Sequence, residues 1–118
     1  MSQVIDAFFA AWGETDPKLR AATLRRCLSD DVAYLDPRLT EPLKGIEAVE
    51  GYVAMYSTYA PGATAEVIQQ TQDGQTTRAS VAFRMSDETV QHGHYFIEAD
   101  DQGRLTRLEG HVGLGETE

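Results

Sequence analysis

The sequence predicts an α+β domain in which three N-terminal helices pack on a curved, mostly antiparallel sheet. Apolar residues recur at helical spacing through the first half of the chain, up to Pro61-Gly62. From Ala63 onward they alternate with polar residues, and turn signals separate four such runs. A chain of 118 residues is long enough for one core and too short for two. Residues 1–118 are therefore expected to form one cone-shaped domain.

The three helices, expected at about residues 2–13, 16–28 and 46–59, have separate start and stop signals. These are Ser2 and Gly13 around the first helix, Asp16-Pro17 and Ser29-Asp30-Asp31 around the second, and Gly45 and Pro61-Gly62 around the third. Serine and aspartate accept hydrogen bonds from the first free N–H groups of a helix, and proline fits its first turn. The first half of the chain is therefore predominantly helical.

The second half predicts four strands at about 63–71, 75–86, 89–100 and 104–113, joined by hairpin turns. A short strand at Val32-Ala33-Tyr34-Leu35 is expected to join this sheet at one edge. Alternation places one apolar face toward the helices. This face forms either a solid core or a pocket for a hydrophobic small molecule. The residues expected to line such a pocket are Phe8, Trp12, Tyr34, Tyr56, Val81, Phe83, Ile97, Leu108 and Val112.

Composition excludes several classes of partner. Ten basic residues against nineteen acidic ones give a formal charge of −9, which repels nucleic acid and anionic membranes. The single Cys27 cannot form an intramolecular disulfide and lies on an apolar helical pattern, so it is interpreted as a buried hydrophobe. The N-terminus has neither a signal peptide pattern nor an apolar stretch of membrane-spanning length. A cytoplasmic protein is expected.

Asp36 is the strongest candidate for a chemical role. It follows the short strand and precedes Pro37, which cannot continue a hydrogen-bonded ladder. We expect a carboxylate at this strand end to carry any chemistry that the chain performs. An aspartate before proline also commonly accepts a hydrogen bond from its own turn. The residues alone leave both interpretations open.

The order of these elements resembles the nuclear transport factor 2-like (cystatin-like) superfamily, and more narrowly the SnoaL-like proteins and the ketosteroid isomerases. The likeness covers nearly the whole chain. The segments that carry it are Asp30-Asp31-Val32-Ala33-Tyr34-Leu35-Asp36-Pro37, Glu41-Pro42 with Gly45, Pro61-Gly62, and Asp101-Gln102-Gly103-Arg104-Leu105.

The resemblance implies an isomerase or cyclase that moves a proton on a hydrophobic carbonyl compound, with Asp36 as general base and no cofactor. Tyr95 aligns with the protonated acid of ketosteroid isomerases, and Phe8 stands where they have a tyrosine. Tyr95 or a tyrosine of the third helix is expected to donate to the ligand oxygen. Gly110 stands where SnoaL-type cyclases have an acid. The alternative is a non-catalytic member of the same fold that binds a ligand or dimerises.

Three histidines share the outward face of the predicted sheet: His92 and His94 on one strand and His111 on the next. Imidazoles at this spacing could meet as metal ligands, but a solvated or dimer-facing surface of mixed charge is the preferred interpretation, and no metal is expected. The resemblance implies a homodimer through this outer face.

Overall fold

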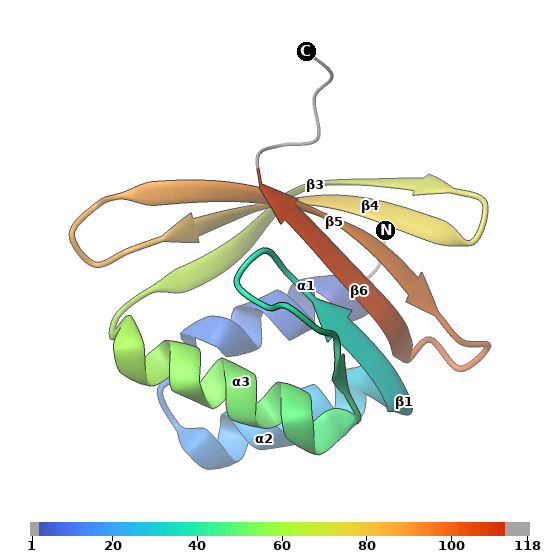
Figure 1. Ribbon diagram of the computed structural model, residues 1–118, viewed down its shortest axis with the longest axis horizontal. Helices are drawn as coiled ribbons and strands as arrows, with labels where there is room; N and C mark the ends of the chain where they lie inside the picture. Colours follow the sequence, from blue (N-terminus) through green and yellow to red (C-terminus); the bar gives the residue numbers. More distant parts are fainter. Residues whose placement is uncertain (1–2, 113–118) are drawn as a thin grey trace.

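The computed structural model describes residues 3–112. Its six strands form one sheet in the order β2-β1-β6-β5-β4-β3, and the three α-helices lie on one side of it (Figure 1). This arrangement confirms the predicted α+β fold. That residues 1–118 form a single domain stays a prediction.

The helices lie close to their predicted positions. The first is an α-helix, α1 (Gln3–Ala10), continued by a 3₁₀ turn, η1 (Ala11–Gly13). The Asp16 side chain caps α2 (Pro17–Cys27) by accepting a 2.9 Å hydrogen bond from the Lys18 amide. Gly45, with a φ of 92°, precedes α3 (Ile46–Tyr59). The predicted cap Ser2 lies outside the described residues.

The strand before Asp36 is longer than predicted. It begins directly after α2, as β1 (Leu28–Leu35), and is not the edge strand, because β2 (Leu43–Lys44) pairs with its outer side. On its other side β1 pairs in parallel with β6 (Leu105–Val112). Ser29-Asp30-Asp31, which were interpreted as the stop signal of the second helix, lie in the first half of this strand. Leu28 and Ala33-Tyr34-Leu35 pair with β6, and the register shifts between Leu28 and Ala33, so the aspartates, which have low strand propensity, lie in an irregular part of the strand.

The remaining sheet is an antiparallel meander of β3 (Thr64–Asp73), β4 (Thr76–Arg84), β5 (Val90–Ala99) and β6. The predicted inward face is confirmed for Val81, Phe83, Ile97 and Leu108, which are all buried. The prediction is wrong for Val112, which lies at the end of β6 and is 79% exposed.

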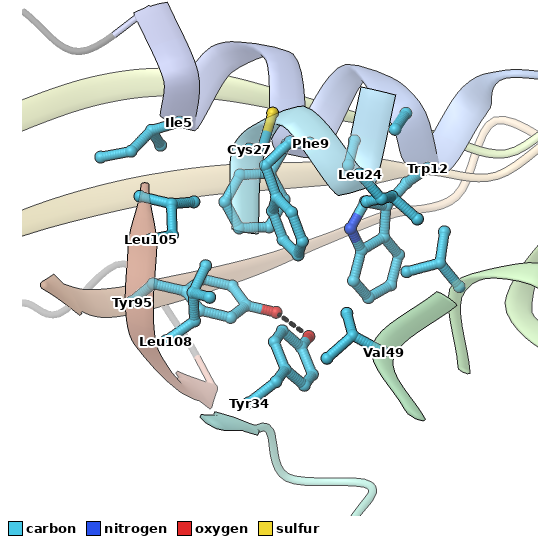
Figure 2. Packing of buried hydrophobic residues seen from close by; sticks show 14 of the residues in the cluster. Ile5, Phe9, Trp12, Leu24, Cys27, Tyr34, Val49, Tyr95, Leu105 and Leu108 are labelled. Carbon is cyan, nitrogen blue, oxygen red and sulfur yellow. Dashed lines mark hydrogen bonds between the residues drawn. The ribbon is translucent and has the colours of Figure 1, made fainter. Parts of the chain in front are cut away.

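The centre of the cone is filled by aromatic side chains, as Figure 2 shows. Phe8, Phe9 and Trp12 reach the sheet from α1 and η1 and are completely or almost completely buried. The rings of Phe9 and Tyr95 meet edge to face with centroids 4.9 Å apart, a favourable aromatic geometry. Of the two possibilities that the sequence leaves open, a solid core describes the centre, and any pocket must lie nearer the rim.

No helix within residues 3–112 is both long and apolar enough to cross a membrane.

Candidate functional site

Asp36 is a turn residue whose carboxylate is also buried. It follows the last residue of β1, and its Oδ1 accepts a 2.9 Å hydrogen bond from the Arg38 amide, which is the Asx-turn geometry. Its carbonyl oxygen accepts from the Leu39 amide at 3.0 Å. Only 2% of the residue is exposed. The turn interpretation is therefore correct as geometry, and the same turn directs the carboxylate inward.

Side chains from three parts of the chain donate to this carboxylate. The Tyr34 hydroxyl of β1 donates to Oδ2 at 2.8 Å, and the Tyr52 hydroxyl of α3 lies 2.8 Å from Oδ2 and 3.0 Å from Oδ1. The Arg38 guanidinium completes the set, with Nη2 3.0 Å from Oδ2. A buried charge is strongly destabilising unless it is paired and hydrogen-bonded. Here the ion pair and the hydroxyl donors compensate it.

Aromatic rings hold the Arg38 guanidinium in place. Its Cζ lies 5.1 Å from the centre of the Tyr56 ring and 5.8 Å from that of Phe83; the rings of Tyr52 and Trp12 are 5.9 and 6.0 Å away. Burial acts to lower the pKa of Arg38, but the adjacent Asp36 carboxylate outweighs burial, and the pKa is raised. Arg38 therefore stays charged.

A chain of hydroxyls connects Asp36 to Tyr95 on β5. The Tyr34 and Tyr95 hydroxyl oxygens lie 2.8 Å apart and point toward each other (Figure 2). An ionised carboxylate can only accept, so the single proton of Tyr34 is used on Asp36. The bond between the two tyrosines must then use the proton of Tyr95. With Asp36 ionised, Tyr95 has no proton left to donate to a ligand, contrary to the role expected from the sequence.

Burial raises the pKa of both Tyr34 and Tyr95 above the usual tyrosine value. For Tyr34 the neighbouring Tyr95 and the Asp36 carboxylate raise it further. Burial also raises the pKa of Tyr52, and its hydrogen bond to Asp36 raises this pKa further. These hydroxyls therefore keep their protons.

A pocket of about 490 Å³ lies at the rim of the cone, next to this network. Its lining residues are Pro37, Arg38, Phe83, Gln91, His92, Gly93, Tyr95, His111 and Val112. Asp36 does not line it. A ligand in this pocket would therefore meet Arg38 and Tyr95, which both contact the Asp36 network.

The predicted pocket residues divide into three groups. Phe83 and Val112 line the pocket. Trp12 and Tyr56 contact the Arg38 guanidinium instead. The others pack in the core beneath, namely Phe8, Tyr34, Val81, Ile97 and Leu108.

Sequence reasoning missed Arg38, and it offered a tyrosine of the third helix as a possible donor without choosing Tyr52. Arg38 follows Asp36 by two residues, a spacing at which the guanidinium can fold back onto the carboxylate of the turn. Tyr52 and Tyr56 are four residues apart and share one face of α3. These spacings were the available signals, but neither specifies which other element the side chains meet.

The outward histidines form a different arrangement from a metal site. The rings of His94 and His111 stack with centroids 5.2 Å apart, and His111 Nε2 lies 3.0 Å from a Glu109 carboxylate oxygen. Phe96 meets both rings edge to face. Across residues 3–112, no group of three or more histidine, cysteine, aspartate or glutamate side chains could hold a metal ion.

Three helices on one side of a mostly antiparallel sheet are the architecture expected from the SnoaL-like resemblance. The profile of the SnoaL-like domain matches residues 5–108. The chain therefore belongs to the SnoaL-like domain family. No curated protein matches it.

Solved structures of the same fold support this assignment. The chain is similar to a candidate isomerase of the SnoaL-like family from Agrobacterium tumefaciens, at 20% identity and a TM-score of 0.83, covering 93% of this chain and 94% of that one. A protein with a ketosteroid isomerase-like fold from Catenulispora acidiphila, in complex with trimethylamine, has 13% identity, a TM-score of 0.78 and coverage of 97% and 88%. A candidate polyketide cyclase from Sinorhizobium meliloti has 18% identity, a TM-score of 0.74 and coverage of 93% and 94%. At such low identities the likeness concerns the fold alone.

Gly110 on β6 leaves the space that the Tyr95 ring fills. A Cβ at this position would lie 2.6 Å from Cε2 and 2.8 Å from Cζ of Tyr95. Gly110→Ala should therefore displace the ring, break the bond to Tyr34 and reduce the free energy of unfolding by about 1–3 kcal/mol in urea denaturation. The matched control is Gly51→Ala in α3, where an added Cβ meets nothing within 4 Å and should stabilise slightly. Equal effects of the two substitutions would contradict this role of Gly110.

The raised tyrosine pKa values predict a loss of stability at high pH. An unfolded tyrosine ionises near about pH 10, whereas Tyr34 and Tyr95 hold their protons to higher pH in the folded state. Their contribution is fully present below about pH 10 and is lost as the pH rises through the folded values. Urea unfolding between about pH 8 and 11 should show this decline, and the double variant Tyr34→Phe/Tyr95→Phe should show a shallower one. An unchanged slope would count against buried, protonated hydroxyls.

Proposed function

We propose that this protein binds a hydrophobic carbonyl compound in the rim pocket and transfers a proton on it, as an isomerase or cyclase with Asp36 as the general base. The observation that carries the proposal is the hydrogen-bonded chain from Asp36 through Tyr34 to Tyr95, which reaches the pocket wall. Through it a buried carboxylate can act on a ligand that it does not touch.

In the proposed step a C–H bond beside the ligand carbonyl breaks, and its electron pair moves to the carbonyl oxygen as an enolate. The proton passes to the Tyr95 oxygen, the proton of Tyr95 passes to Tyr34, and that of Tyr34 passes to Asp36. Each tyrosine remains neutral, as their raised pKa values require. The reverse transfer onto a different carbon would complete an isomerisation. Attack of the enolate carbon on a second carbonyl of the ligand would form a C–C bond and an alkoxide, and return of the proton along the same relay to that alkoxide would complete a cyclisation.

The surroundings of the relay suit this chemistry. Asp36 is nearly inaccessible to water, and Phe83 and Val112 supply an apolar pocket wall. A general base must be held within hydrogen-bond reach of the proton path, and the 2.8 Å contacts satisfy this along the whole chain.

The second candidate is a protein that binds a small ligand without a reaction. It is favoured by the saturation of Asp36, whose carboxylate accepts from three side chains and from its own turn. A carboxylate in that state is a common structural device. The protein from Catenulispora acidiphila, which is in complex with trimethylamine, is a neighbour in this fold with a bound small molecule.

Deuterium exchange at the α-carbon of a panel of hydrophobic ketones separates the two candidates. Asp36→Asn keeps the side-chain volume and removes the base, so exchange should fall roughly a hundredfold or more while ligand affinity stays nearly constant. Tyr34→Phe and Tyr95→Phe should each cause a comparable loss, because each interrupts the relay. Glu41→Gln, an exposed carboxylate of the same loop, is the matched control. If a ketone is exchanged equally by wild type and Asp36→Asn, the ligand-binding candidate is the better one.

We also propose a homodimer through the outer face of the sheet, in a cytoplasmic protein. The supporting feature is the ring cluster of His94, Phe96 and His111 on that face, where Phe96 is only half-buried. Light scattering at micromolar concentration should give twice the monomer mass. Phe96→Glu should return the mass to that of the monomer without unfolding the chain. A monomeric wild type would contradict the proposal.

A further inference from the structure

The directions of the hydroxyl hydrogen bonds limit which groups near the pocket can donate a hydrogen bond to a ligand oxygen. With Asp36 ionised, the protons of Tyr34 and Tyr52 are directed to Asp36, so the bond between Tyr34 and Tyr95 must use the proton of Tyr95. The Tyr56 hydroxyl donates to the Met85 sulfur at 3.8 Å. While Asp36 is ionised, these hydroxyls meet a ligand only as acceptors.

Arg38 differs from the tyrosines in its exposure and in its number of hydrogen-bond donors. Its side chain is 44% exposed, whereas the Asp36 side chain behind it is 0% exposed. The ion pair therefore directs its positive end toward the pocket that Arg38 lines. A guanidinium has five N–H donors, and Asp36 takes one at Nη2. The hydroxyls of Tyr52 and Tyr56 also interact with it.

The guanidinium is also fixed in position before any ligand arrives. The four rings around it come from η1, α3 and β4, and Pro37 precedes it in the turn. A donor that is already oriented loses little on binding, and a charged donor on an apolar wall forms a stronger bond than a neutral one.

We propose that Arg38 forms an oxyanion-binding subsite in the rim pocket, and that the ligand is an apolar molecule carrying an anionic oxygen such as an enolate, phenolate or carboxylate. Tyr95 contacts the same ligand as an acceptor. The subsite rests on the proposed use of this pocket, but it does not depend on proton transfer. A carbonyl compound that becomes an enolate during the proposed reaction belongs to the same ligand class.

The test compares the binding of 4-nitrophenolate with that of 4-nitroanisole, which has a similar shape and no ionisable oxygen. Absorbance and calorimetric titrations of wild type should show that the phenolate binds about tenfold or more tightly than the ether. Arg38→Met keeps the apolar stem and removes the charge, so this preference should disappear while the ether binds as before. Arg84→Met removes an exposed guanidinium of β4 that pairs with Glu66 and does not line the pocket, so it should retain the preference.

Arg38→Met leaves Asp36 buried without its partner, which can prevent folding. The double variant Asp36→Asn/Arg38→Met removes both charges together and should also lose the preference. Equal binding of the two probes by wild type, a preference that survives either Arg38 variant, or binding of neither probe would each overturn the subsite. None of these titrations involves turnover. A phenolate preference that depends on Arg38, found together with unchanged deuterium exchange in Asp36→Asn, would leave the subsite standing and refute the proposed proton transfer.

Discussion

The hydrogen bonds and the ion pair that compensate the buried Asp36 carboxylate link several elements of this structure. Asp36 lies at the end of β1, and its partners come from β1 itself, from α3 and from the turn that follows. A carboxylate with so little exposure is tolerated only where donors surround it, so the position of α3 relative to β1 is tied to the Tyr52 bond. Arg38 extends this dependence to the aromatic residues of η1 and β4. Removing one partner would leave a buried charge that the others cannot fully compensate.

The way the core is filled decides where open space remains. Aromatic rings from α1, η1 and the sheet occupy the centre of the cone, and the pocket lies at the rim between β4, β5, β6 and the turn after β1. Gly110 has no side chain, and the Tyr95 ring occupies the volume that a side chain there would need. This arrangement places the Tyr95 hydroxyl against Tyr34. Gly110 stands where the resemblance implies an acid in SnoaL-type cyclases. In this chain the same position leaves room for the Tyr95 ring.

The hydrogen-bond directions change the chemical roles of the residues that the sequence singled out for the site. Asp36 and Tyr95 were both singled out from the sequence, one as a base and the other as a donor. Each hydroxyl carries a single proton. With Asp36 ionised, Tyr34 donates to Asp36 and Tyr95 donates to Tyr34, so Tyr95 can only accept from a ligand. The charged donor on the pocket wall is then Arg38, whose importance depends on its placement between a carboxylate and four rings.

The sequence by itself determined the order and type of the elements other than β2 and the start of β1, because helix caps, prolines and alternation act over a few neighbouring residues. Asp16-Pro17, Gly45 and the period-two pattern of β4 and β5 are such local signals, and they also assigned Val81 and Ile97 to the core. Tertiary structure alone decided the pairing of β1 with β6, the filled centre, and the meeting of Tyr34, Tyr52 and Tyr95 around Asp36. These residues are up to 61 positions apart, and no local pattern records which distant side chains will share one buried charge. That selection depends on which donors the packed elements bring within hydrogen-bond distance of the carboxylate.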